Sequence, residues 1–104
     1  MIPTGGVNVY PAEIEGLLVN HDKVADVAVF GIPNEEVGEE GKAVVQLMNH
    51  ADASNEMAED LLIWMRERLS SVKVPRSIDF MEQLPRMDNG KLYKRHLMDA
   101  YKAS

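Results

Sequence analysis

The sequence contains no cysteine among its 104 residues. This absence excludes a disulfide framework, a thiolate metal site and a cysteine nucleophile, and it fits a reducing compartment. The sequence also lacks a run of about 18 apolar residues, and its N-terminus lacks a basic stretch followed by an apolar one. We therefore expect neither a transmembrane segment nor a signal peptide, and we expect a soluble, cytoplasmic protein.

An excess of positive charge is missing as well, because the formal net charge is −6 and the pI is about 4.9. Nucleic-acid binding needs a clustered basic face, so we expect no nucleic-acid partner. The charge is nevertheless uneven: residues 1–85 carry 6 Lys and Arg against 15 Asp and Glu (−9), and residues 86–104 carry 5 against 2 (+3). A basic end suits a phosphate-bearing ligand, and it equally suits a final helix whose cations complement its dipole.

Residues for a complete active site are not present in any recognisable pattern. The histidines are His21, His50 and His96, on separate expected elements and without i, i+4 pairing, so we expect no metal site. Clustered glutamates at positions 35, 36, 39 and 40 are typical of a solvated acidic loop rather than of an acid/base pair. No set of nucleophile, base and orienting residue can be assembled. The chain therefore supplies at most parts of a site that another domain completes.

Apolar periodicity predicts helices over residues 11–21, 55–70 and 92–100. Pro11 suits the first position of the first helix, and Ser54 suits the N-cap of the second. The expected core stripe of the second helix consists of Met57, Leu61, Trp64, Met65 and Leu69. Methionine and tryptophan at this spacing are typical of core packing rather than of a cofactor site.

Strands are expected over residues 24–30, 41–48 and 77–82. Gly31 and Pro33 are expected to end the first strand, and residues 31–40 to form an acidic loop before the second. The second strand alternates apolar residues with Lys42 and Gln46, which predicts one face in solvent. Together these elements predict a single α+β domain over residues 1–104, with a small three-stranded, mainly antiparallel sheet and about three packing helices.

Two segments combine glycine with groups that recognise ligands. Near the C-terminus the chain reads Pro85-Arg86-Met87-Asp88-Asn89-Gly90-Lys91, and Asn-Gly is a strong turn signal, so Lys91 is expected at the tip of a tight reversal. This turn is not a P-loop, because the upstream glycine and the following Ser or Thr are missing. Near the N-terminus the chain reads Thr4-Gly5-Gly6-Val7-Asn8-Val9-Tyr10-Pro11. Taken alone, the spacing of Gly5 and Gly6 favours a simple turn before the first helix.

With Phe30–Glu39 and Val72-Lys73-Val74-Pro75, these two segments make four blocks. In their order and separations the blocks resemble the C-terminal domain of the adenylate-forming acyl-CoA synthetases, over practically the whole chain. The resemblance implies a lid domain that caps a larger N-terminal domain and takes up two orientations. That larger domain is implied to bind ATP with magnesium and the carboxylic acid, whereas this domain alone is expected to be inactive.

The resemblance also implies a role for each segment. In one orientation Lys91 would enter the site and contact the substrate carboxylate and the α-phosphate while acyl-AMP forms. In the other, the loop Gly5-Gly6-Val7-Asn8 would face the cleft and help line the channel through which the pantetheine thiol of CoA attacks. The N-terminal block is more similar to that of acyl- and aryl-CoA ligases than to that of peptide-synthetase domains, which favours CoA over a carrier-protein arm.

The sequence departs from the family pattern at two positions, where Asn89 replaces the usual Thr and Val72 the usual Tyr. The usual hinge Asp or Lys would precede Met1, so we expect the chain to be part of a longer ligase, and whether Met1 is native stays open. The alternative is a free-standing α+β interaction module that binds a partner through its acidic face. The coding sequence upstream of Met1 separates the two.

Overall fold

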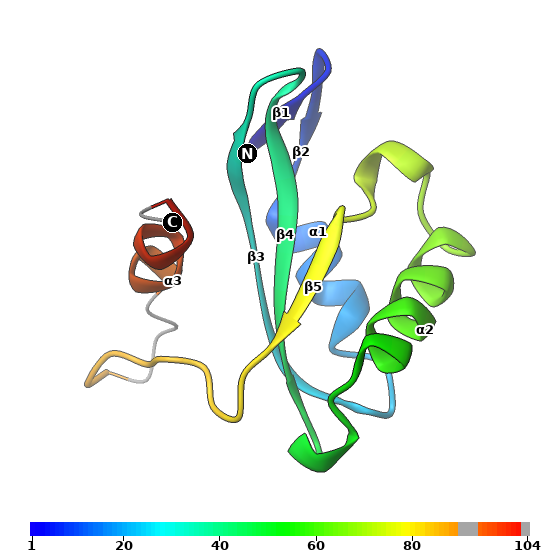
Figure 1. Ribbon diagram of the computed structural model, residues 1–104, viewed down its shortest axis with the longest axis vertical. Coiled ribbons are helices and arrows are strands. Elements are labelled where there is room, and N and C mark those ends of the chain that lie inside the picture. Colours follow the sequence, from blue (N-terminus) through cyan, green and yellow to red (C-terminus); the bar gives the residue numbers. More distant parts are fainter. Residues whose placement is uncertain (90–93, 103–104) are drawn as a thin grey trace.

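The computed structural model describes residues 1–89 and 94–102. Its elements are β1 (Ile2–Thr4), β2 (Val7–Val9), α1 (Pro11–Leu18), β3 (Val24–Asn34), β4 (Gly38–Leu47), the 3-10 turn η1 (His50–Asp52), α2 (Asn55–Arg66), the 3-10 turn η2 (Ser71–Lys73), β5 (Ser77–Phe80) and α3 (Lys94–Lys102). The helices α1 and α2 cover one face of the sheet, and α3 covers the other (Figure 1). This arrangement confirms the predicted α+β class.

The sheet has five strands among the described residues, so the prediction of three was wrong. β4 pairs antiparallel with β3 along its length, antiparallel with β1 at Gly38 and parallel with β5 from Lys42 to Val45. The two additional strands are β1 and β2, which form a hairpin. Each has three residues, too few to show the alternation by which a strand is recognised in a sequence.

The sequence predicted that this strand would end at Gly31 and Pro33. In the structure β3 continues through both residues to Asn34. Proline is tolerated here because β3 lies at the end of the strand order β2-β1-β4-β3, where a missing N–H need not break the ladder. Asn34 Oδ1 then accepts hydrogen bonds from the amides of Glu36 (2.8 Å) and Val37 (3.1 Å) and tightens the turn into β4. The expected ten-residue acidic loop is therefore mostly a continuous antiparallel ladder.

Successive side chains of β3 and β4 point to opposite faces of the sheet and contribute to two separate hydrophobic cores. Val27, Val29, Ala43 and Val45 pack against α1 and α2, while Ala28, Phe30 and Val44 face Leu84 and the Leu97 side chain of α3. The prediction that one face of the second strand, β4, lies in solvent was therefore wrong. The helix α3 covers this face, and Lys42 is only 8% exposed. The sequence pattern showed the polar residues of that face but not the helix that packs on them.

The helix starts follow their predicted signals. Pro11 occupies the first turn of α1, and Ser54 Oγ accepts a hydrogen bond from the Met57 amide at 3.0 Å as the N-cap of α2. Of the predicted α2 stripe, Leu61 and Met65 are fully buried, and the other three side chains pack against the same core. The first two helices end earlier than predicted, at Leu18 and Arg66, and α3 (Lys94–Lys102) continues past the predicted end at residue 100. The predicted start of this last helix, at residues 92 and 93, lies outside the described residues.

Candidate functional site

The Gly5-Gly6 pair forms the turn of the β1–β2 hairpin. Thr4 pairs with Val7, so the loop has two residues, and the backbone φ angles are +56° at Gly5 and +84° at Gly6. Two consecutive positive φ angles define a type I′ turn, whose twist matches that of the flanking strands. The Gly5 amide also donates to the Val37 carbonyl at 3.1 Å, which ties the hairpin tip to the β3–β4 turn. The prediction that Gly5 and Gly6 form a turn before the first helix is thus confirmed.

The hairpin tip is open to solvent. Gly5, Gly6, Val7 and Asn8 are all exposed, and a Cβ built on Gly6 would have no neighbouring atom within 4 Å. Glycine is therefore required at position 6 by backbone conformation, not by packing. An exposed, thin turn without side chains is a surface past which a narrow ligand or another chain can lie closely.

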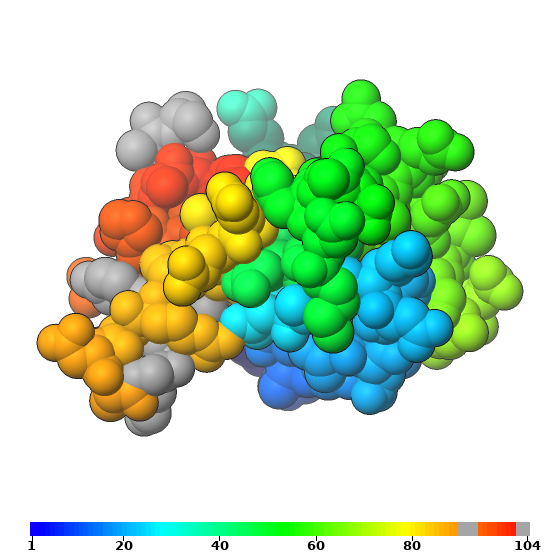
Figure 2. Space-filling view, turned by 90° about the horizontal axis from the view of Figure 1, so that it is seen from below, coloured from blue at the N-terminus to red at the C-terminus, as the bar shows by residue number. Residues whose placement is uncertain are grey.

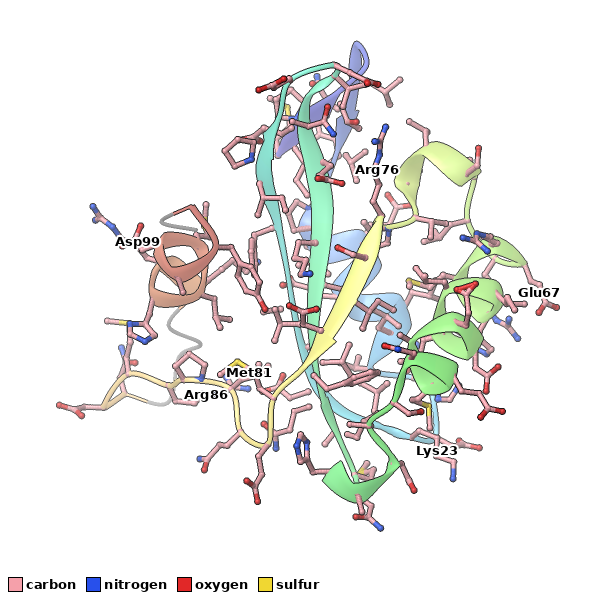
Figure 3. The ribbon with its side chains drawn as sticks, in the orientation of Figure 1. Lys23, Glu67, Arg76, Met81, Arg86 and Asp99 are labelled. Carbon is pink, nitrogen blue, oxygen red and sulfur yellow. The ribbon has the colours of Figure 1, made fainter. Side chains whose placement is uncertain are left out.

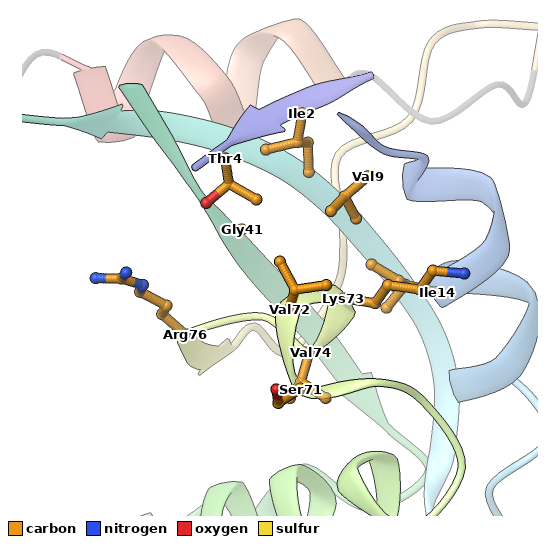
Figure 4. Close-up of a pocket in the computed structure, with 10 residues that line it drawn as sticks. All are labelled: Ile2, Thr4, Val9, Ile14, Gly41, Ser71, Val72, Lys73, Val74 and Arg76. Atoms are coloured by element: carbon orange, nitrogen blue, oxygen red, sulfur yellow. The ribbon is translucent and has the colours of Figure 1, made fainter. Parts of the chain in front are cut away.

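A cavity of about 130 Å³ opens beside this hairpin, between β1–β2, α1 and η2 (Figure 4). Its lining residues are Ile2, Thr4, Val9, Ile14, Gly41, Ser71, Val72, Lys73, Val74 and Arg76. Half of the lining residues are aliphatic, and the polar side chains come mainly from η2 and the residues after it. The cavity is large enough for a few methylene groups or several waters.

Two cations stand at this cavity, and they differ in their surroundings. Lys73 Nζ lies 2.9 Å from Glu13 Oε1, so its charge is neutralised by α1. Arg76 is exposed, extends away from the rim of the cavity in Figure 4, and forms no ion pair with any residue that the structure describes. Its backbone is fixed, because the Arg76 amide donates to the Gly41 carbonyl at 2.9 Å. Arg76 is the available cation next to the glycine hairpin.

The segment from β5 to α3 is held against the sheet at several points. Its Leu84 side chain is 1% exposed, and the Leu84 amide donates to Gln46 Oε1 of β4 at 3.0 Å. Two residues later the Arg86 guanidinium forms an ion pair with the Asp26 carboxylate of β3. In the space-filling view from below, this yellow-to-orange segment lies beside α3, with green α2 on the opposite side (Figure 2). The predicted turn residues Asp88 and Asn89 follow directly and are exposed.

The start of α3 is held in a similar way. Lys94 Nζ lies 2.7 Å from Glu15 Oε2 of α1, and the same carboxylate oxygen accepts the Val29 amide of β3 at 2.8 Å. Glu15 therefore connects three elements, α1, β3 and α3. Lys91, the expected catalytic residue, and Gly90 lie outside the described residues, between the Arg86 and Lys94 anchors.

A polar network joins α3 to the sheet. Lys42 Nζ lies 3.0 Å from Asp79 Oδ1 and donates to Ser77 Oγ at 3.1 Å, while the Tyr101 hydroxyl donates to Asp79 Oδ2. Burial raises the pKa of the Asp79 carboxyl, but the hydrogen bonds from Tyr101 and Lys42 and the Lys42 charge together hold that pKa below its ordinary value of 3.8. Burial and the Asp79 carboxylate raise the pKa of Tyr101 well above its ordinary 10.0. The network thus fixes α3, which follows the predicted lysine turn.

The glycine hairpin and the segment that leads into the predicted lysine turn lie at opposite ends of the domain. Arg76, beside the cavity next to the glycine hairpin, lies near one end of β5, and Arg86, which leads into the lysine turn, lies beyond the other (Figure 3). The described residues contain no group of three or more His, Cys, Asp or Glu arranged for a metal ion. In the same part of the chain, no helix is long and apolar enough to cross a bilayer.

Sequence reasoning missed Arg76 and the Lys42–Asp79–Tyr101 network. Arg76 follows directly on the recognised Val72–Pro75 block, so its position beside a conspicuous motif was the available signal. Nothing in the sequence links Lys42 with Asp79, because their proximity arises from the parallel pairing of β4 with β5.

A small domain that presents two exposed elements at opposite ends is suited to serving a site on a second body. The family model of the AMP-binding enzyme C-terminal domain matches residues 13–91, and the chain belongs to this family. It is 45% identical over 94 residues to a feruloyl-CoA synthase from Amycolatopsis sp., an alignment that covers 90% of this chain and 18% of the relative.

Solved structures agree. A Mycobacterium tuberculosis fatty acyl CoA synthetase matches with a TM-score of 0.88 and 37% identity, covering 99% of this chain and 20% of that one. An ATP-bound RpMatB-BxBclM chimera matches with a TM-score of 0.91 and 37% identity, covering 96% of this chain and 20% of that one. The chain therefore spans about a fifth of the length of the proteins it matches.

Proposed function

We propose that this chain is the C-terminal lid domain of an ATP-dependent carboxylic-acid–CoA ligase that acts on a fatty acid or a related acid in the cytoplasm. The family match over residues 13–91 carries the proposal, and the two exposed elements at opposite ends of the domain support it. A larger N-terminal domain of the same chain would hold the acid and ATP with its magnesium ion. The lid would then serve two half-reactions, one with each end.

In the first half-reaction the substrate carboxylate attacks the α-phosphate of ATP, and acyl-AMP and pyrophosphate form. Lys91 is the residue proposed to stabilise the negative charge that spreads over the reacting oxygens. A positioned ammonium in a water-poor cleft contributes to such a step on the order of 2.7–4 kcal/mol, as single charge-stabilising groups do in other enzymes.

In the second half-reaction the CoA thiol attacks the acyl carbon and AMP leaves. The Gly5-Gly6 turn, with Val7 and Asn8, is proposed to border the path of the pantetheine arm, because an exposed turn without side chains leaves room for a thin ligand. Arg76 is proposed to meet the phosphates of CoA, since it is an exposed cation beside the cavity next to the hairpin.

The half-reactions provide the test. In the ligase that carries this domain, Lys91→Ala should lower acyl-AMP formation, measured by pyrophosphate exchange, by roughly 10²–10³-fold. Thioester formation from supplied acyl-AMP should be retained, because a group that acts in only one orientation affects only one step. Lys23→Ala, which removes an exposed lysine elsewhere, is the matched control and should leave both steps unchanged. Equal losses in both steps for Lys91→Ala would contradict the proposed role.

A separate measurement concerns the 104-residue chain by itself. We expect it to catalyse no pyrophosphate exchange with any acid, because the nucleotide site belongs to the other domain. Measurable exchange by the purified chain would contradict the lid assignment.

A further inference from the structure

We propose that Asp26 and Glu15 are positioning residues for acyl-adenylate formation, each anchoring one end of the segment that carries Lys91. The inference rests on the proposed role of Lys91. Arg86 precedes Lys91 by five positions and Lys94 follows it by three, and each of these cations is bound by one of the two carboxylates.

The two anchors are built in the same way on β3. Asp26 Oδ1 accepts the Val27 amide at 2.9 Å while Oδ2 binds the Arg86 guanidinium. Glu15 Oε2 accepts the Val29 amide at 2.8 Å and lies 2.7 Å from Lys94 Nζ. Each carboxylate is therefore oriented by a backbone amide of one rigid strand before it receives its cation. The amides belong to alternate residues of β3, so the two anchors lie along the same side of that strand.

The anchors also share one surface groove, which is lined by Glu15, Gly16, Val19, Asp26, Val27 and Lys94. The two ends of the lysine segment are thereby fastened to a common base made of β3 and α1. Fixing both ends of a short segment removes most of the conformations it could otherwise adopt.

These two ion pairs are too exposed to contribute much to the stability of the fold. Their side chains are 43% and 22% exposed in the Arg86–Asp26 pair and 31% and 23% exposed in the Lys94–Glu15 pair. Pairs with this exposure contribute little to the free energy of unfolding. A displacement of a reacting group by about 1 Å, by contrast, can cost roughly 10²-fold in rate. Loss of an anchor should therefore lower the rate of acyl-AMP formation, the step that uses Lys91, more than it lowers the free energy of unfolding.

The test uses Asp26→Asn and Glu15→Gln in the intact ligase. Both substitutions keep an oxygen that can accept the β3 amide and remove the negative charge that binds the cation. Asp26→Asn also replaces the oxygen that binds the Arg86 guanidinium by an NH2 group. We expect each to lower kcat for acyl-AMP formation by roughly ten- to a hundredfold, with unchanged thioester formation and an unchanged melting temperature. Arg86→Gln should also lower acyl-AMP formation, and the Asp26→Asn/Arg86→Gln double variant should cost no more than Arg86→Gln alone, because the Asp26–Arg86 ion pair is already lost in that single variant.

Glu13→Gln is the matched control, since Glu13 lies on the same helix and pairs with Lys73 at 2.9 Å away from the lysine segment. It should leave acyl-AMP formation unchanged. Hydrogen exchange at the amides of Met87, Asp88 and Asn89 gives a readout that does not depend on catalysis: it should accelerate in Asp26→Asn and not in Glu13→Gln.

Lys91→Ala separates the possible failures. If Lys91→Ala blocks adenylation while Asp26→Asn and Glu15→Gln have no effect, the anchoring inference is overturned and the proposed function stands. If Lys91→Ala has no effect, the proposed function is wrong, and the positioning role is overturned with it. Additive losses in the double variant, or losses equal to those of Glu13→Gln, would also overturn the inference.

Discussion

Lys42 Nζ and Asp79 Oδ1 lie 3.0 Å apart on the parallel strands β4 and β5. The lysine side chain is only 10% exposed, while that of the aspartate is 44% exposed. Lys42 also lies 5.0 Å from the centre of the Tyr101 ring, so the ammonium, the carboxylate and the phenol link both strands to α3. A largely buried cation of this kind is compatible with the fold only because the partners are in place.

Removal of the carboxylate should therefore destabilise the domain. We expect Asp79→Ala to lower the free energy of unfolding by about 1–3 kcal/mol, because it leaves the Lys42 ammonium with one hydrogen-bond partner fewer in a buried position. Asp79→Asn keeps one acceptor oxygen, for either the Tyr101 hydroxyl or Lys42, and should cost less than Asp79→Ala. Urea unfolding of the 104-residue chain measures both. Equal losses for the two variants would show that the charge, not the hydrogen bonding, sets the stability.

The same network predicts a pH dependence at the acid end. The pKa of Asp79 is lower in the folded protein than its ordinary 3.8, so the folded state favours the ionised carboxylate. The resulting stabilisation is fully present above pH 3.8 and is lost as the pH falls through the lower folded pKa. Urea midpoints measured between about pH 2.5 and 7 should fall more steeply at the acid end for the wild type than for Asp79→Asn. Parallel curves would mean that Asp79 titrates alike in both states.

Two glycines give opposite expectations for the same substitution. Gly6→Ala should lower the free energy of unfolding by roughly 1 kcal/mol, because φ is +84° and alanine is strained there. Gly16→Ala, inside α1 with no atom within 4 Å of the new Cβ, should raise it by about 0.5–1 kcal/mol. Thermal unfolding of both variants measures the difference, and a neutral Gly6→Ala would contradict the type I′ turn.

The elements that the sequence predicted correctly are those with local causes. Ser54 caps α2, and Pro11 opens α1, because each acts on its own backbone neighbourhood. The failures have long-range causes. Pro33 does not stop β3, since the strand lies at the end of the sheet order, and Lys42 is not solvated, since α3 packs over it. Neither circumstance is encoded within a window of a few residues.

The candidate site divides in the same way. The Gly5-Gly6 turn was predicted from its residues, and the structure adds that both backbone angles require glycine or a residue that tolerates positive φ. Asp26 and Glu15 gave no signal in the sequence, because their cations are 60 and 79 positions away along the chain. The role of Lys91 stays a prediction, since that residue lies outside the described residues.

The glycine hairpin also predicts an effect on the thioester step. Gly6→Ala and Gly6→Leu share the strain of positive φ, so their difference isolates the size of the side chain. If the hairpin borders the pantetheine path, Gly6→Leu should slow transfer to CoA well beyond Gly6→Ala, with pyrophosphate exchange near normal in both. We would abandon the channel role if the two variants transferred the acyl group equally, or if exchange fell in step with transfer.

Arg76 offers a test at the same end of the domain that leaves the hairpin intact. Its guanidinium is exposed and forms no ion pair with any of the residues that the structure describes, so Arg76→Gln removes a charge without breaking such a contact. If Arg76 meets the phosphates of CoA, this variant should raise KM for CoA by roughly ten- to a hundredfold, as the loss of a charged hydrogen bond of about 1.5–3 kcal/mol implies. The kcat of thioester formation and the pyrophosphate exchange rate should stay unchanged, because the contact is remote from the reacting atoms.

Dephospho-CoA and CoA should be compared as thiol substrates: a variant that lowers the preference for CoA identifies the 3′-phosphate as the group bound. An unchanged KM for both thiols would show that the CoA phosphates do not approach this end of the lid.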